Sequence, residues 1–214
     1  MGSRGGASGK SSGGARAFSN DEEILDYEIN EFLDWKSQLT EEQLKAAQEY
    51  ALDSTGLNDY LRGNREAPRG MDVDEMTKAL DGAISHSLST SMTVYRGVGT
   101  DYLGLDLSNE KAVKGLVGKT IKDPAYMSTA ISRNVGEVYS RGVMLKVSVP
   151  KGKKVMSPDI AESSVKQLRG FLADGDIGNT ELVFKRNSSL KITGYKKRTT
   201  SSGRTMFEIE AKMM

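Results

Sequence analysis

The 214-residue sequence contains no cysteine and a single histidine, His86. The absence of cysteine excludes disulfide bonds, a thiolate nucleophile and cysteine-ligated zinc or iron–sulfur centres. One histidine is too few for a histidine-rich metal site and leaves one candidate base for a serine triad. We therefore expect no metal ion in this protein.

Long apolar runs are also missing. No segment is long enough to span a bilayer, and no apolar signal core lies near the N-terminus. Thirty basic and 29 acidic residues give a net charge of +1, which does not indicate binding to nucleic acid or to a membrane surface. These absences predict a soluble protein whose export, if any, uses no cleaved hydrophobic signal.

Residues 1–20 are rich in glycine, serine, alanine and arginine and have almost no apolar side chains. Such a segment cannot bury enough surface to offset its ordering entropy, so it is predicted to be a disordered tail. The chain as a whole is 37% hydrophobic, which is enough for one core. Residues 21–214 are therefore predicted to form a single domain.

The first half of this domain has helical spacing, and the second half has strand-like runs. Helix-start signals stand at Asn20–Glu23 and Thr40–Gln43, and a further helix is predicted over 71–91. The strand-like runs lie at 93–99, 119–121, 125–130, 143–150 and 206–211. Helices followed by strands predict an α+β fold with a mostly antiparallel sheet.

Glu181 stands where a glycine- and aspartate-rich loop enters the apolar run Leu182–Phe184. A polar turn and a second run beginning at Leu190 predict a hairpin here. A carboxylate in this place is suited to catalysis, because the strand fixes it and the loop can gate it. Glu181 is therefore the first candidate for a catalytic residue.

Other functional patterns are incomplete or absent. Gly97 and Gly99 begin a dinucleotide fingerprint, but Tyr102 occupies the third glycine position and no parallel βαβ pattern surrounds it. The sequence has neither a phosphate-binding P-loop nor a nucleophile elbow. The basic cluster Lys196–Arg198 precedes a Ser/Gly turn and is interpreted as a solvated hairpin end. Nucleic acid is thus not the expected partner, although it stays open as an acceptor.

Three blocks occur in order: Tyr95-Arg96-Gly97, then residues 125–129 (Ala-Tyr-Met-Ser-Thr), then Glu181-Leu182-Val183. They resemble the signature blocks of the arginine–serine–glutamate class of ADP-ribosyltransferases, which includes binary-toxin enzymes, C3-like exoenzymes and phage enzymes. Segments 39–62, 118–124 and 145–152 also resemble segments of that family. The resemblance covers about residues 36–211 in unbroken order, and the ordered set is far more specific than any single block.

The resemblance implies a helical layer packed on a two-sheet core, with NAD as the substrate. Glu181 would bind the ribose 2′-hydroxyl and stabilise the positive charge that develops on the ribose as nicotinamide leaves. An unperturbed glutamate has a pKa of ~4.3, so we expect Glu181 to be charged at neutral pH. Ser128 would orient Glu181, and Thr129 would support the strand. Arg96 would offer a planar fork of donors to the pyrophosphate.

Five further residues join the expected NAD site through the resemblance. Gly97, which follows the arginine, would let the ligand approach the backbone. Asn58 and Arg62 match positions that help to grip the dinucleotide. Tyr139 and Arg141 are the candidates for an aromatic residue that stacks on nicotinamide and an arginine that meets the phosphates.

The acceptor side departs from the family at Asn179, two residues before Glu181. The family usually carries glutamate or glutamine there, and glutamate goes with an arginine acceptor. Asparagine cannot act as a carboxylate base toward a guanidinium, so a conventional arginine acceptor is not expected. Phe171 and Asn179 bound the loop expected to recognise the acceptor. Ala130 replaces a second serine of the family and removes one hydroxyl.

These features favour a mono-ADP-ribosyltransferase that modifies a macromolecule, expected to be a host protein. It would be a toxin, effector or phage protein acting in the target-cell cytoplasm. An NAD glycohydrolase would use the same Arg96 and Glu181 with water as the acceptor. The third alternative is a non-catalytic binding or virion module, and the intact arginine, serine and glutamate argue against it.

Overall fold

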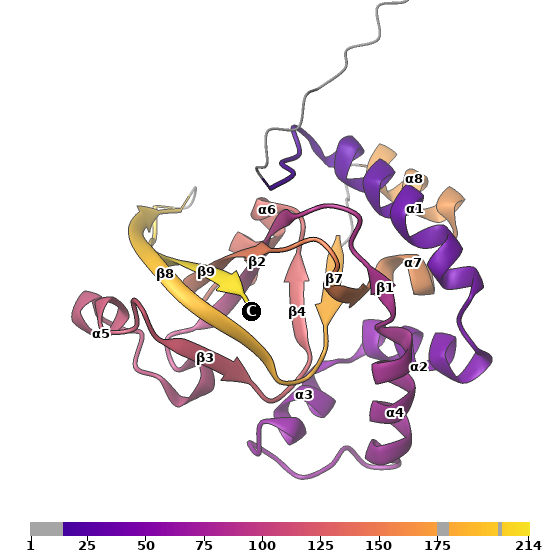
Figure 1. Cartoon of the computed structure of the whole chain (residues 1–214), viewed down its shortest axis with the longest axis horizontal. Helices are drawn as coiled ribbons and strands as arrows, with labels where there is room; N and C mark the ends of the chain where they lie inside the picture. The colour runs from indigo at the N-terminus through magenta and orange to yellow at the C-terminus, as the bar shows by residue number, and fades with distance from the viewer. Residues whose placement is uncertain (1–14, 175–179, 201–202) are drawn as a thin grey trace, which may run out of the picture.

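The computed structural model describes residues 15–174, 180–200 and 203–214. The longer helices gather at one end of the molecule, and strands β8 and β9 lie at the other (Figure 1). The helical elements are α1 (Asp21–Ser37), α2 (Glu41–Leu52), α3 (Thr55–Leu61), α4 (Val73–Ala83), η1 (Tyr102–Gly104), α5 (Glu110–Lys114), α6 (Arg133–Val138), α7 (Pro158–Glu162) and α8 (Val165–Ala173). None of these described helices is long and apolar enough to cross a membrane.

The helix starts follow from local sequence. Thr40 accepts the backbone N–H of Gln43, whose side chain accepts the N–H of Thr40, so the expected capping box is present at α2. The helix predicted over 71–91 is too long, because α4 ends at Ala83. The indole N–H of Trp35 donates to the Ala83 carbonyl at 2.8 Å, and the chain then leaves the helix to form a short strand.

The strands form a single nine-stranded sheet in the order β1-β6-β7-β4-β2-β5-β9-β8-β3. They are β1 (His86–Ser87), β2 (Met92–Gly99), β3 (Thr120–Asp123), β4 (Met127–Ala130), β5 (Gly142–Val149), β6 (Lys154–Met156), β7 (Glu181–Phe184), β8 (Ser188–Thr199) and β9 (Thr205–Met213). Of the neighbouring pairs, β5 and β9 are parallel and the rest are antiparallel. The predicted α+β class and mostly antiparallel sheet are confirmed.

The expected division into two sheets is not confirmed, because hydrogen bonding joins all the described strands in one order. The two halves of the sheet meet at a narrow junction. There β2 pairs with β4 at one position, Tyr95 opposite Ala130, whereas β2 pairs with β5 along its whole length. Arg96, Ser128 and Glu181 lie on three successive strands at this junction.

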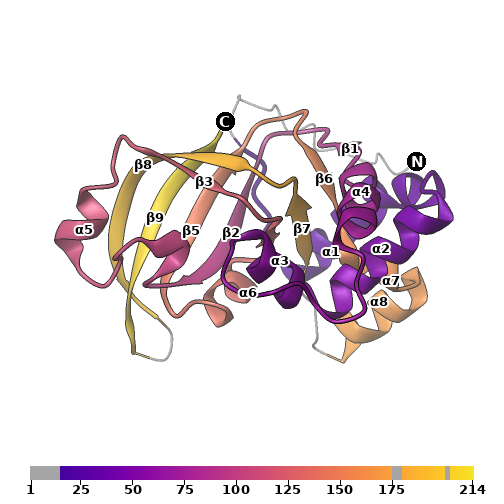
Figure 2. The ribbon, with the colours of Figure 1, turned by 90° about the horizontal axis from the view of Figure 1, so that it is seen from below.

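The hairpin expected between Glu181 and Leu190 is wrong. Strand β7 lies between β4 and β6, whereas β8 lies between β9 and β3. Both edges of β7 are therefore already paired when the chain leaves it. The turn contains Asn187 in the left-handed region, with φ of 64°, and carries the chain to the other half of the sheet (Figure 2).

The described chain begins at Ala15, and residues 15–20, which the composition assigned to the tail, contact the domain. The backbone N–H of Arg16 donates to the carbonyl of Ser91 at 2.7 Å. The ring of Phe18 packs against Tyr27, with ring centres 5.2 Å apart. The remaining expected tail residues, 1–14, lie outside the described part of the chain.

Apolar side chains from the helices and the sheet form one core, in which Phe32, Tyr50, Tyr126 and Phe184 are among the largest fully buried side chains. The rings of Tyr50 and Tyr126 meet edge to face at 5.8 Å. Burial of such rings stabilises the fold by about 1.5–3 kcal/mol each. It also fixes their hydroxyls, which need hydrogen-bond partners inside the protein.

Candidate functional site

A groove of about 430 Å³ opens where α2, α3, α6 and strands β2, β4 and β7 meet. Nine of the expected site residues line it: Asn58, Arg62, Arg96, Gly97, Ser128, Thr129, Tyr139, Arg141 and Glu181. Of the two residues expected to recognise the acceptor, Phe171 is half-exposed on α8, and no residue of this helix is among the described residues that line the groove. Asn179 lies outside the described residues.

A chain of hydrogen bonds leads from the helical layer to Glu181. The side-chain amide of Asn58 donates to the Tyr50 hydroxyl at 2.8 Å, and this hydroxyl lies 2.8 Å from Oγ of Ser128. Ser128 in turn is hydrogen-bonded to the Glu181 carboxylate. Because a carboxylate only accepts, each hydroxyl donates toward Glu181 and accepts from the group behind it. Tyr50 was not among the residues expected in the site.

The pKa of Glu181 is raised to about 7, mainly by burial and also by the Asp159 carboxylate, whereas the hydrogen bond from Ser128 and the charge of Arg96 oppose the rise. The expectation that Glu181 is fully charged at neutral pH without special tuning is therefore wrong. It assumed a solvated carboxyl, but the strand carries Glu181 into a poorly solvated position, where the charged form is disfavoured.

The backbone that presents Glu181 is held on both sides. Thr180 is completely buried and adopts a φ of +43°, which is uncommon for a residue other than glycine. Its carbonyl accepts the N–H of Ile131 at 3.0 Å, and its hydroxyl accepts the N–H of Ser132 at 3.3 Å. The N–H of Glu181 donates to a carboxylate oxygen of Asp159 at 2.8 Å. Sequence reasoning missed Thr180 and Asp159.

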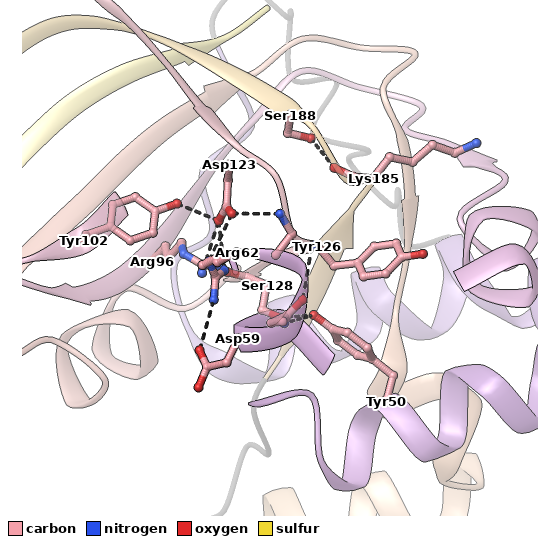
Figure 3. Close-up of polar contacts among 12 residues, drawn as sticks. Tyr50, Asp59, Arg62, Arg96, Tyr102, Asp123, Tyr126, Ser128, Lys185 and Ser188 are labelled. Carbon is pink, nitrogen blue, oxygen red and sulfur yellow. Dashed lines mark hydrogen bonds and ion pairs between the residues drawn. The ribbon is translucent and has the colours of Figure 1, made fainter. Parts of the chain in front are cut away.

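A buried aspartate, Asp123, organises two of the arginines that line the groove, Arg62 and Arg96 (Figure 3). It accepts two hydrogen bonds from Arg62, at 3.1 and 3.0 Å, and lies 3.7 Å from the guanidinium of Arg96. The hydroxyl of Tyr102 donates to it at 2.8 Å. Sequence reasoning missed Asp123 as well, although it stands in the block that leads to Ser128.

Arg96 is held in place but retains a free donor. One of its terminal nitrogens donates to the carbonyl of Ser128 at 2.6 Å, and its guanidinium lies 5.5 Å from the ring centre of Tyr102. Its Nε is buried and has no hydrogen-bond partner among the described residues. A buried N–H without a partner is costly.

A sequence model of the ADP-ribosyltransferase exoenzyme family matches residues 26–214. The chain belongs to this family. It is an NAD-dependent mono-ADP-ribosyltransferase, and NAD is its substrate. A comparison with curated proteins finds no match.

Solved structures of toxins have the same fold. The ADP-ribosyltransferase toxin Plx2a from Paenibacillus larvae is similar, with a TM-score of 0.74 and 23% identity over 91% of this chain and 96% of the toxin. The C3 exoenzyme of Clostridium limosum gives 0.73 and 19% identity over 94% and 98%. C3stau2 from S. aureus, solved with NAD, gives 0.70 and 20% identity over 94% and 98%.

In this exoenzyme Gly97 has a different reason for being glycine from the one expected. A Cβ on Gly97 would lie 2.3 Å from the backbone N of Ser140 and from the carbonyl carbon of Tyr139. The reciprocal contact is similar, since a Cβ on Gly136 of α6 would lie 2.6 Å from Cβ of Tyr95. Gly97 lines the groove, but it is the approach of α6 to β2, rather than of a ligand, that leaves no room for a side chain.

The groove of the exoenzyme opens between α6 and the end of β2. Tyr139 follows α6 and is 58% exposed, and Arg141 is also exposed. The backbone N–H of Arg141 donates to the carbonyl of Val98 at 3.1 Å, so this residue is tied to β2 through its main chain. Asn58 is buried below, and its side-chain oxygen accepts the N–H of Tyr126 at 3.1 Å. Thr129 donates to the Leu182 carbonyl at 2.8 Å, which ties β4 to β7.

A second hollow of the exoenzyme, of about 390 Å³, lies along α1. The charged residues that line it are Arg16, Glu22, Glu23, Asp26 and Glu31. Four carboxylates against one guanidinium would repel the pyrophosphate of NAD. The charge of the two hollows therefore favours the groove at Glu181 as the nucleotide site.

Proposed function

We propose that this exoenzyme cleaves the nicotinamide–ribose bond of NAD beside Glu181 and transfers ADP-ribose to a protein of a target cell. One observation carries the proposal. The groove that holds Arg62, Arg96 and Arg141 also contains a carboxylate, Glu181, hydrogen-bonded to Ser128 on the neighbouring strand. Cationic donors and a buried carboxylate in one groove match the two ends of the reaction, a pyrophosphate to be held and a ribose to be stabilised.

Glu181 acts on the ribose. As the bond to nicotinamide breaks, its electron pair leaves with nicotinamide and positive charge develops on the ribose. The ionised carboxylate of Glu181 stabilises this charge, and the hydrogen bond from Ser128 keeps it in one orientation. Burial makes the ionised form poorly solvated, so an adjacent positive charge interacts with it more strongly than it would in water.

Arg96 and Arg62 act on the pyrophosphate. Both are oriented before substrate arrives, because Asp123 binds one and lies beside the other. Asp59, 3.8 Å from Arg62, is a second carboxylate that helps to hold this guanidinium in place. A guanidinium presents a planar fork of N–H donors, which suits the oxygens of a phosphate. Arg141, exposed at the mouth, supplies a third cation.

The acceptor is proposed to be a host protein residue other than a conventional arginine. Asn179 supports this part, since an amide cannot remove a proton from a guanidinium. Two exposed side chains with apolar surface also line the groove, Leu52 at 76% and Tyr139 at 58% exposure, and a protein surface would cover them. Since NAD is an intracellular metabolite, we place the reaction in the target-cell cytoplasm.

The test follows both products from NAD labelled in the ADP-ribose part, with and without a target-cell lysate. We expect nicotinamide release and label on lysate protein, and neither with Glu181→Gln. The matched control is Glu162→Gln, an exposed residue of α7 that should behave as wild type. Release without label transfer would instead indicate an NAD glycohydrolase, and label on nucleic acid would contradict the protein acceptor. No release by folded wild-type protein would favour the non-catalytic module.

A further inference from the structure

Two acidic side chains, Asp159 and Glu28, interact with Glu181 but are not among the described residues that line the groove. Asp159 in the first turn of α7 accepts the backbone N–H of Glu181 at 2.8 Å. Ser157, the N-cap of the same helix, donates to Glu28 of α1 at 3.1 Å. Ser157 is completely buried, and Glu28 is only 1% exposed. The first turn of α7 is thus anchored to α1 and carries a carboxylate to the start of β7.

We infer that Asp159 is a positioning residue for the reaction. It holds the backbone N–H of Glu181, and its negative charge disfavours the ionised form of the glutamate. The inference rests on the function proposed above for Glu181. Asp159 itself does not line the groove, so it acts through Glu181 and not on the substrate.

The geometry explains why this carboxylate is needed. Thr180 turns the chain sharply into β7 with a φ of +43°, a conformation that costs on the order of 1 kcal/mol or more for a residue other than glycine. Strain of this kind persists only where the surroundings hold it. Ile131 and Ser132 hold the Thr180 side of the turn, and Asp159 holds the Glu181 side. Without Asp159 the Glu181 N–H loses its partner, and the turn is free to relax and move the carboxylate.

The charge of Asp159 has a separate consequence. Among the described residues, the polar and charged groups that interact with Glu181 are Asp159 on α7, Glu28 on α1, Tyr50 on α2, Arg96 on β2 and Ser128 on β4. Burial is the main reason that the pKa of Glu181 rises to about 7, and Asp159 is the charged neighbour that raises it. Burial, and after it the charge of Asp159, also raises the pKa of Glu28 well above its usual range.

Two variants of Asp159 separate its two effects. Asp159→Asn keeps an oxygen that can accept the Glu181 N–H but removes the charge, whereas Asp159→Ala removes both. The control is Glu162→Gln, which removes a charge from the exposed end of the same helix. Each is assayed for nicotinamide release from NAD across pH 5–9, with NAD binding and thermal unfolding measured alongside.

For wild type we expect kcat/KM to rise with pH to a midpoint near the pKa of Glu181 in the free enzyme, about 7. In Asp159→Asn the midpoint moves down by roughly 0.5–1 pH unit, because a like charge has gone. Its activity at pH 6 is then roughly threefold or more above wild type. In Asp159→Ala we expect kcat at pH 8 to fall at least roughly tenfold, with NAD affinity little changed, because the carboxylate is misplaced.

The inference is overturned if the Asp159→Asn midpoint coincides with that of wild type and Glu162→Gln, or moves upward. Wild-type kcat in folded Asp159→Ala would overturn it as well, and if that variant does not fold, the profile of Asp159→Asn decides alone. Glu181→Gln separates this result from the proposed function. Turnover by Glu181→Gln refutes the catalytic role, whereas an inactive Glu181→Gln with an unshifted Asp159→Asn refutes only the role of Asp159.

Discussion

Glu181→Gln should remove NAD turnover and, at neutral pH, make the folded protein more stable. Burial raises the pKa of Glu181 from 4.5 to about 7. In the unfolded chain the carboxyl ionises at its ordinary value, so between these two values the folded state binds the proton more tightly than the unfolded state. Stability therefore falls as the pH rises above the unfolded value, and the loss is complete above the folded value. Glutamine has the same shape and no charge, so it removes this penalty.

The size of the effect follows from the shift. A rise from 4.5 to about 7, at about 1.36 kcal/mol per pKa unit, corresponds to at most about 3 kcal/mol at pH 8. For a domain of this size, about 1 kcal/mol changes Tm by about 2–4 °C. We therefore expect Glu181→Gln to melt up to about 10 °C above wild type at pH 8 and at nearly the same temperature at pH 4.5, where the wild-type carboxyl is protonated in the folded state.

Thermal unfolding by circular dichroism over pH 4.5–8, together with nicotinamide release, tests this reasoning. Glu162→Gln serves as the control, because Glu162 is exposed and its replacement should change neither quantity. If wild type and Glu181→Gln differ by the same amount at every pH, burial does not raise the pKa of Glu181. Turnover by a folded Glu181→Gln would refute its catalytic role whatever the melting curves show.

Three further predictions concern other residues in and around the groove. Ser128→Ala removes the hydrogen bond that lowers the Glu181 pKa, so the midpoint of the kcat/KM profile should move above 7, opposite to Asp159→Asn; an unchanged midpoint would contradict the contact. Asp123→Ala leaves buried guanidinium charge without its partner, and we expect a loss of about 3–5 kcal/mol in urea unfolding and weaker NAD binding by titration. Gly97→Ala should destabilise the protein and impair turnover, because its Cβ would lie 2.3 Å from backbone atoms. Gly170→Ala is the control and should be neutral or stabilising, because a Cβ there would have no atom within 4 Å. Equal melting temperatures of the two variants would refute this packing argument.

The family and the arginine, serine and glutamate of the groove could be predicted, because these residues stand in short local blocks. Arg96, Ser128 and Glu181 each stand in a short strand with its own pattern of apolar neighbours, and the structure places these strands at one junction of the sheet. The capping box at Thr40 and the start of α1 were predictable for the same reason, since a cap depends on residues three positions apart.

The supporting contacts could not be predicted, because they join residues far apart in the chain. Arg62 and Asp123 are 61 positions apart, and Glu28 and Ser157 are 129 apart. An aspartate before a proline or in a short helix has no local pattern that distinguishes it from a solvated one. The failed hairpin after β7 has a related cause, since the partners of a strand are decided by which edges other strands already occupy.

By itself, the sequence determined that this protein is an α+β NAD-dependent ADP-ribosyltransferase, and it identified nine of the residues that line the groove. These properties follow from local patterns and from the order of the blocks. The tertiary structure alone decided how strongly each of these side chains is held and charged. The pKa of Glu181 depends on burial by α1, α2 and α7 and on the carboxylate of Asp159, and none of these is near it in the chain. Desolvation and charge act through space, so only the folded arrangement determines them.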